Sequence, residues 1–220
     1  VLFPNINKTL KFNFNHNHKT LKEIWAEEEK DLKEDNKYLF DKLMDEVLNS
    51  SIDFPQECKG KVIFVNSANK NKKQDGISWD RAFSSFDTAY ETAQDNDQIW
   101  IAKGDYISSY IIKKNIEIYG GFSGIETKGW QRYITKTITN FSNTLQIEGA
   151  NKLIKLNGLR LTGIHIRNSN FEISNTSVFF TNSNTLGLAD SKGFIRNFYV
   201  DASSRHQIAL VSSRSKLDVL

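Results

Sequence analysis

The sequence predicts an all-β fold, a right-handed parallel β-helix that begins with a strand-helix cap and carries a helical N-terminal extension. Three observations lead to this prediction. Residues 62–65 form a short β-branched run, and residues 84–95 carry apolar side chains at helical spacing. Short β runs recur about every 22 residues, the length of a solenoid coil with three strands and three turns, at Ile116, Ile138, Ile164, Leu186 and Ile208.

Composition bounds the class of protein before any motif is considered. The chain has 220 residues, of which 39% are hydrophobic and 12% aromatic, and this excludes a disordered chain. The net charge of +3 gives no argument for a nucleic-acid partner, and no apolar run is long enough to span a bilayer. Cys58 is the single cysteine, so an intrachain disulfide is excluded, and no phosphate loop, nucleophile elbow or zinc-ligand spacing is present. We therefore expect no cofactor and no metal.

Residues 1–59 form the predicted N-terminal extension, with helix over residues 20–50. Thr20 and Glu23 have the spacing of a capping box, and Phe54-Pro55 prevents the helix from continuing. The apolar side chains of this segment recur at helical spacing and must pack on something. We expect them to pack on the rest of the chain, and the alternative is a docking helix for a larger assembly. The stripe includes Leu21, Trp25, Leu39 and Leu43.

Residues 60–220 form the predicted β-helix, with a cap helix over residues 84–95. Phe86 and Tyr90 lie on the apolar face of that helix, which suits it to cover the open end of a β stack. A solenoid needs such a cover because its first coil otherwise exposes unpaired backbone groups and an apolar interior. Asp97 either accepts backbone hydrogen bonds where the helix meets the next strand or is a solvated loop residue. We also expect Gly104 to allow a tight turn.

Several submotifs occur in one order along residues 62–127: VIFVN, DGISWDRAF, a helix, QIWIAKGDY and IEIYGGFSGIET. This segment resembles the N-terminal part of pectin-lyase-like right-handed β-helix domains of large bacterial surface and secreted proteins. Asn96 departs from the family pattern, where glycine is preferred, and so does the segment 129–133, where an Arg-Asp pair is usual. The resemblance implies a β-helix fold and an extracellular or cell-surface location, and it does not specify an activity.

Beyond residue 129 the chain consists of short β runs separated by polar turns. Alternation over residues 159–167 sends Leu159, Leu161, Ile164 and Ile166 to the interior. Asparagine marks the expected turns because it tolerates the left-handed conformation and stacks on an equivalent residue of the next coil. The turn asparagines are Asn168, Asn170, Asn175, Asn182 and Asn184.

Acidic residues are scarce in the coils. Glu148 and Glu172 are separated by about one coil and are placed to stack on neighbouring rungs, although solvated positions beside turns are the simpler interpretation. Arg160, His165 and Arg167 are expected on outward positions, where they either contact an anionic glycan or belong to an ordinary hydrated surface. Trp130 and Tyr133 are placed to stack on sugar rings or to pack against the coil edge.

The predicted function is a non-catalytic scaffold, extracellular or on the cell surface. It is either adhesin-like, with a glycan or protein partner, or a structural subunit of a larger surface assembly. The alternative is a polysaccharide lyase or glycoside hydrolase of the same superfamily with its site beyond residue 220, because the chain is expected to be truncated at its C-terminus. A nucleic-acid partner and a membrane span are not expected.

Overall fold

The structure is a computed structural model that describes residues 55, 58–134, 136–149, 153–179, 186–201, 211–213 and 215–219. The helices predicted over residues 20–50 lie outside these residues. The elements are β1 (Val62–Val65), α4 (Phe86–Thr92), β2 (Gln98–Ala102), β3 (Gly104–Tyr106), β4 (Ile111–Ile112), β5 (Glu117–Phe122), the 3-10 turn η3 (Gly129–Gln131), β6 (Thr139–Glu148), β7 (Leu153–Asn157), β8 (Leu159–Arg167), β9 (Asn170–Phe179), β10 (Leu186–Ala189), β11 (Lys192–Asp201), β12 (Val211–Ser213) and β13 (Lys216–Val219).

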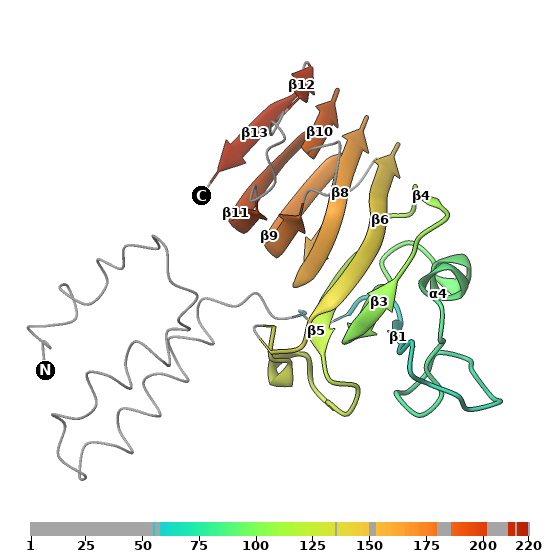
Figure 1. Cartoon of the computed structure of the whole chain (residues 1–220). Helices are drawn as coiled ribbons and strands as arrows, with labels where there is room; N and C mark the ends of the chain where they lie inside the picture. The colour runs from blue at the N-terminus through green and yellow to red at the C-terminus, as the bar shows by residue number, and fades with distance from the viewer. Residues whose placement is uncertain are drawn as a thin grey trace, which may run out of the picture. The chain divides into compact units, whose positions relative to one another are not determined.

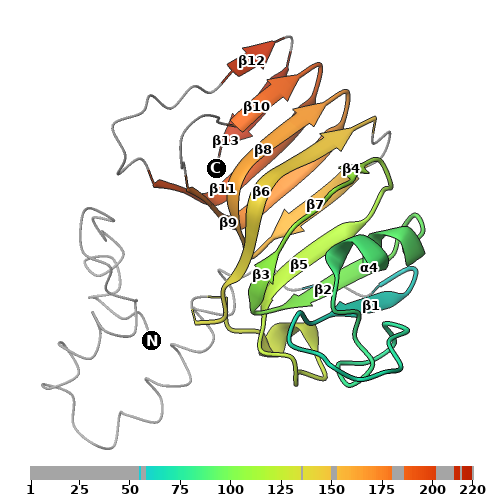
Figure 2. The ribbon, with the colours of Figure 1, turned by 45° about the vertical axis from the view of Figure 1, so that its right-hand side comes forward.

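The strands form one sheet that curls into a half-barrel (Figures 1 and 2). Every strand pairing among the described residues is parallel. Parallel neighbours need a crossover connection, so the chain must travel round between one strand and the strand beside it. The prediction of a predominantly β chain with parallel strands is confirmed.

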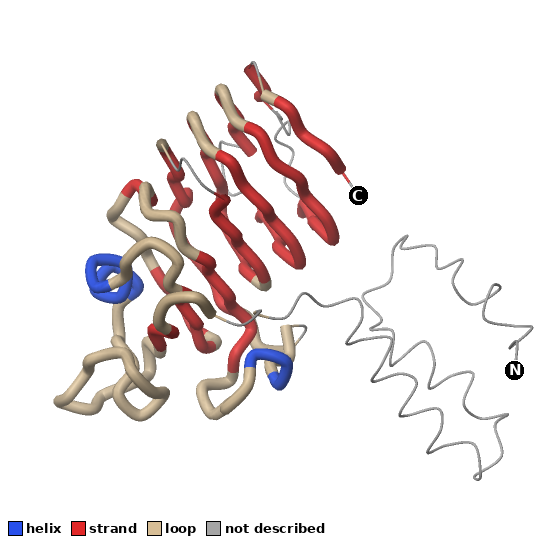
Figure 3. The backbone as a smooth tube through the Cα atoms, turned by 180° about the vertical axis from the view of Figure 1, so that it is seen from behind, coloured by secondary structure: helices blue, strands red, loops and turns tan. Residues whose placement is uncertain are grey.

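The chain visits three groups of strands in a repeating order. Group A contains β1, β2, β5, β7, the first halves of β9 and β11, and β13. Group B contains β3, the beginnings of β6 and β8, and the second halves of β9 and β11. Group C contains β4, the ends of β6 and β8, β10 and β12. Figure 3 shows the strands of the later part of the chain one above another.

The register only partly follows the predicted 22-residue repeat. Ile164 pairs with Leu186, which is 22 positions later, whereas Ile154 pairs with Phe171, which is 17 positions later. Ile138 was expected to be equivalent to Ile164, but the partner of Ile164 is Leu145. The expectation is wrong at Ile138 because the excursion between β5 and β6, whose described residues are 123–134 and 136–138, lengthens the sequence before β6.

One apolar core lies inside the curl, and alternation along each strand supplies it. Leu159, Leu161, Ile164 and Ile166 are all buried in it, as predicted. The alternation is interrupted between Leu161 and Ile164, which are separated by two residues instead of one. The interruption occurs because β8 passes from group B to group C at Gly163.

The corners of the curl are occupied by residues with left-handed backbone. Between groups A and B these are Gly158 (φ 73°), Asn175 (φ 48°) and Asn197 (φ 46°), and between groups C and A they are Gly149, Asn168 and Asp190. Asn197 Nδ2 donates to Asn175 Oδ1 at 3.1 Å, so these two side chains stack between successive turns of the chain. The turn predictions are confirmed for Asn168 and Asn175.

The turn prediction is not confirmed for the remaining three asparagines. Asn170 begins β9 and pairs with Leu153, so its assignment to a turn is wrong. The turn lies at Asn168 and Ser169, immediately before it. Asn182 and Asn184 lie outside the described residues.

The N-terminal edge of the sheet is covered by the segment before α4. Phe64 N donates to Gly76 O at 2.9 Å, and Phe83 N donates to Phe64 O at 2.9 Å. These bonds satisfy backbone groups on the side of β1 that faces away from β2. Helix α4 buries Phe86 and Tyr90 against the core, as predicted.

Helix α4 is shorter than the predicted span of residues 84–95. Ser84 N donates to Gln74 Oε1 at 3.0 Å, so this residue belongs to the preceding loop. At the other end, Asp97 Oδ2 accepts a bond from Gln94 N at 2.8 Å, while Asp97 Oδ1 accepts one from Lys61 N at 2.7 Å. Asp97 thus holds the connection to β2 in a turn, which is the first of its two predicted alternatives.

Candidate functional site

The outward side of group A carries a row of charged side chains. Glu117, Lys155 and Glu172 are direct neighbours in register on β5, β7 and β9. Lys155 Nζ lies 3.3 Å from Glu117 Oε1, and Arg196 on β11 lies 3.4 Å from Glu172 Oε1. The charges alternate in sign along the row, so adjacent strands stabilise each other.

A second outward row lies two residues farther along each strand. Tyr119, Asn157 and Ser174 are in register there. Tyr119 Oη donates to Glu117 Oε2 at 2.9 Å, and Asn157 Nδ2 donates to Ser174 Oγ at 2.7 Å. The two rows are therefore connected by hydrogen bonds.

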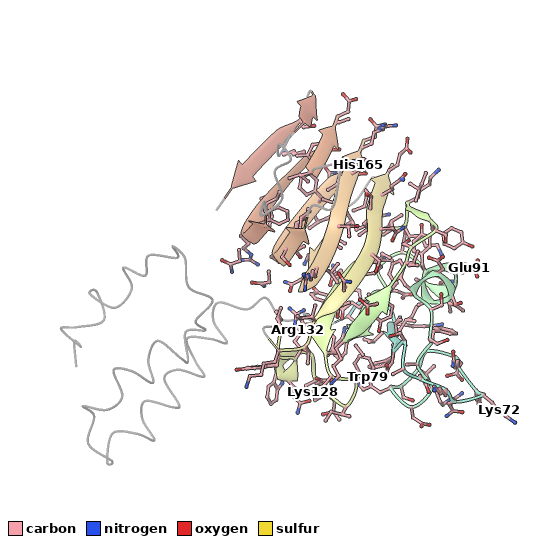
Figure 4. The ribbon with its side chains drawn as sticks, viewed as in Figure 1. Lys72, Trp79, Glu91, Lys128, Arg132 and His165 are labelled. Carbon is pink, nitrogen blue, oxygen red and sulfur yellow. The ribbon has the colours of Figure 1, made fainter. Side chains whose placement is uncertain are left out.

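Arg132 joins this surface to the excursion of residues 123–138. Its guanidinium donates to Gly120 O at 3.0 Å and to Asn157 Oδ1 at 2.6 Å. It also lies over the ring of Tyr119, 5.2 Å from the ring centroid. Arg132 is almost fully buried, and Figure 4 shows it beside the sheet, with Lys128 from the same excursion below it.

The environment shifts the pKa values of three of these groups. Burial lowers the pKa of Arg132 to about 10, and the neighbouring Tyr119 opposes that shift. Burial, followed by the charge of Glu117, raises the pKa of Tyr119. Burial also raises the pKa of Glu172, and the positive charge of Lys155 opposes the rise. Partly buried, coupled charges of this kind are typical of functional sites and also of structural ion-pair networks.

An aromatic cluster continues the outward surface toward the N-terminal strands. Trp100, Tyr119 and Phe122 form its buried part, and Phe64 and Trp79 pack against it. The rings of Trp100 and Phe122 are stacked with centroids 4.8 Å apart. This cluster and Arg132 hold the excursion against β5.

Trp130 and Tyr133 lie in the excursion, on either side of Arg132 in the sequence. Their exposed fractions are 57% and 36%. Tyr133 N donates to Gly121 O at 3.1 Å, which places Tyr133 at the end of β5. The backbone of Tyr133 is therefore fixed beside β5, and the Trp130 side chain is largely exposed to solvent.

The other predicted contact residues are on β8. Arg160 pairs with Asn140 and Ser177 in group B, whereas His165 and Arg167 pair with Gln146 and Glu148 in group C. Figure 4 shows His165 on the upper part of β8, well away from Arg132. The structure brings His165 and Arg167 together and places Arg160 on another group of strands.

Glu148 and Glu172 do not stack, so the less favoured of the two interpretations of this pair is wrong. Glu148 pairs with Arg167 in group C, and Glu172 pairs with Lys155 in group A. Their separation in sequence matched the repeat length, but the last part of β6 and the first part of β9 belong to different sides of the curl.

Sequence reasoning missed the row around Lys155, the role of Arg132 and a ladder of serines. Ser169 N donates to Ser191 Oγ at 3.3 Å, and Ser191 N donates to Ser215 Oγ at 3.1 Å. Ser169 and Ser191 each follow the left-handed residue that turns the chain from group C to group A. The signal was present as a serine recurring at intervals of 22 and 24 residues.

The part of the chain that the structure describes contains no cluster of three His, Cys, Asp or Glu side chains suited to a metal ion. The same residues include no helix with the length and hydrophobicity that a bilayer crossing requires. The docking stripe with Leu21, Trp25, Leu39 and Leu43 lies outside the described residues. A scan against protein-family models, a search of curated proteins and a search of solved structures each returned no match.

Proposed function

We propose that the β unit is a right-handed parallel β-helix that starts at β1, and that the protein is a non-catalytic scaffold of the cell surface or the extracellular space. The right hand follows from the general preference of parallel crossover connections. The observation that carries the scaffold proposal is the use of polar side chains in stacking. Asn175 and Asn197 bond each other, and Ser169, Ser191 and Ser215 bond successive turns of backbone.

Such ladders stabilise an elongated stack whose outward surfaces are free to contact partners. The alternating charges of Glu117, Lys155 and Glu172 compensate one another, and this suits a surface that must remain folded and hydrated outside a cell. The partner we propose is a glycan or a protein of a larger surface assembly. The resemblance of residues 62–127 to surface and secreted β-helix proteins supports the location.

Binding without chemistry is the outcome that tests this proposal. The purified protein is incubated with pectin and with alginate, and both retention on the immobilised polymer and release of reducing or unsaturated ends are measured. The scaffold proposal predicts no release of ends at any protein concentration. Depolymerisation that scales with protein and disappears in Glu172→Gln would overturn it.

A second candidate function is a polysaccharide-cleaving enzyme, and one specific observation favours it. Glu117 and Glu172 lie two strand spacings apart, or about 10 Å between their backbones, with Lys155 between them. Carboxyl groups roughly 6.5–9.5 Å apart are used by inverting glycosidases, in which the residue with the raised pKa is the general acid. Glu172 takes that role in this candidate, since its pKa is raised.

The matched control for Glu172→Gln is Glu148→Gln, because Glu148 lies on group C, away from Lys155. An enzyme loses its activity in the first variant and keeps it in the second. A scaffold has no activity to lose in either, and its retention on a polymer is measured separately.

A further inference from the structure

Two loops at one end of the strands carry exposed apolar side chains. The first is residues 66–82, before α4, and the second is residues 123–136, after β5. In Figures 1, 2 and 3 both loops project from the lower end of the sheet. Ile77 in the first loop is 63% exposed, and Ile125 in the second is 83% exposed. Trp130, also in the second loop, is 57% exposed.

The two loops are fixed to each other. Trp79 Nε1 of the first loop donates to Glu126 O of the second at 2.8 Å, and the Trp79 ring packs on Phe122 with centroids 5.4 Å apart. Ile77 and Ile125 are near neighbours in sequence of the two residues that form this bond. The loops that carry the exposed apolar side chains are therefore held together. We call their exposed residues the loop surface: Ile77, Ile125 and Trp130 with the exposed lysines of both loops.

The second loop is held in shape by its own carboxylate. Glu126 accepts hydrogen bonds from Ser123 N at 2.6 Å, Gly124 N at 3.0 Å and Ile125 N at 3.0 Å. This arrangement presents the Ile125 side chain outward on a defined turn. Exposure of a large apolar side chain to water is unfavourable, so covering it with an apolar partner lowers the free energy.

The charge of the loop surface is positive. Residues 66–82 contain four basic and two acidic side chains, and residues 123–136 contain three basic and one acidic. The acids have partners within the loops: Asp75 pairs with Arg81, Asp80 accepts a bond from Asn71, and Glu126 bonds its own turn. The exposed lysines are Lys70, Lys72, Lys73, Lys128 and Lys136.

We propose that the loop surface binds a bilayer that contains anionic lipid. Isoleucine and tryptophan at loop tips enter the boundary between headgroups and acyl chains, and lysines around them attract anionic headgroups. An anionic glycan would use the lysines but would leave the two isoleucines in water. The isoleucines are therefore the feature that distinguishes a lipid surface from a polysaccharide.

The test is co-sedimentation of the full chain with phosphatidylserine–phosphatidylcholine vesicles, compared with phosphatidylcholine alone. We expect binding to the anionic vesicles that weakens with added salt. Replacement of either isoleucine by serine should lower the partition coefficient about tenfold, and replacement of one lysine by glutamine about fivefold. Ile107→Ser is the matched control, since Ile107 is 62% exposed but lies between β3 and β4, outside both loops.

Three results would overturn the proposal. The first is the absence of sedimentation with anionic vesicles. The second is wild-type binding by the folded double variant I77S/I125S, which would mean that charge alone attracts the protein. The third is a concentration-dependent dimer that the same double variant abolishes while vesicle binding is absent, which would make a second copy the occupant. Circular dichroism confirms that each variant is folded before its binding is compared.

Discussion

The left-handed backbone at Asn175 reverses the usual order of stability between alanine and glycine variants. Asn175 has φ 48° and accepts a 3.1 Å hydrogen bond from Asn197. Alanine at this position loses that bond and must hold a left-handed backbone, which costs about 1–2 kcal/mol for a residue with a Cβ. Glycine loses the same bond but adopts the conformation without steric cost. We therefore expect Asn175→Gly to be more stable than Asn175→Ala by about 1 kcal/mol.

Urea unfolding followed by circular dichroism measures this difference through the midpoints and slopes of the two variants. Asn170 is the control position, because it lies at the start of β9 and its φ is not positive. There the usual order holds, and glycine is the less stable variant because it loses more backbone freedom on folding. If Asn175→Ala is at least as stable as Asn175→Gly, residue 175 does not turn a left-handed corner and the corner ladder is not formed.

Three further predictions concern packing, helix capping and pH. A Cβ at Gly193 would lie 2.2 Å from Phe171 O. Gly193→Ala should therefore lower the free energy of unfolding by more than about 2 kcal/mol. An unchanged melting temperature would contradict the close approach of β9 and β11. Lys114 Nζ donates hydrogen bonds to three backbone carbonyls at the end of α4. Lys114→Ala should therefore lower the free energy of unfolding by about 1–2 kcal/mol. Lys113→Ala is the control and should leave the stability unchanged, because Lys113 is exposed. Burial opposes ionisation of Glu126, but its hydrogen bonds outweigh burial and lower its pKa below the ordinary 4.5. Its ionised form therefore stabilises the protein above that value, and this stabilisation is lost as pH falls through the lowered pKa. In Glu126→Gln the urea midpoint of unfolding should fall less steeply as the solution is acidified, and the same steepness as in the wild type would refute this.

The sequence was sufficient to predict features that depend on near neighbours. Alternation within residues 159–161 and within residues 164–166 identified the buried side chains, because successive side chains of a strand point to opposite faces. Asn168 and Asn175 were recognisable as corners because few residues tolerate the left-handed conformation. The bond that Asp97 accepts from Gln94 N is local in the sequence, whereas the bond that it accepts from Lys61 N joins residues 36 positions apart.

Features that depend on register between distant segments were not predictable. Arg132 lies in a segment that looked like an exposed insertion, yet it bonds Asn157, which is 25 positions away. The row of Glu117, Lys155 and Glu172 is formed by steps of 38 and 17 positions, and no fixed repeat leads to it. Segments outside the strands lengthen the sequence between stacked strands, so a spacing of about one coil does not show that Glu148 and Glu172 are neighbours.

The most direct test of the stacked arrangement is a set of distances between spin labels on group C. With Cys58 replaced by serine, one label is placed at Val211 and the second at Ile111 or Gln146. Register passes from Ile111 to Gln146, His165, Gly187 and Val211, one strand at a time. At about 4.8 Å per strand, the stack requires backbone separations of about 19 Å from Ile111 and about 14 Å from Gln146. Equal distances for the two pairs, or a longer distance from Gln146 than from Ile111, would contradict the stack.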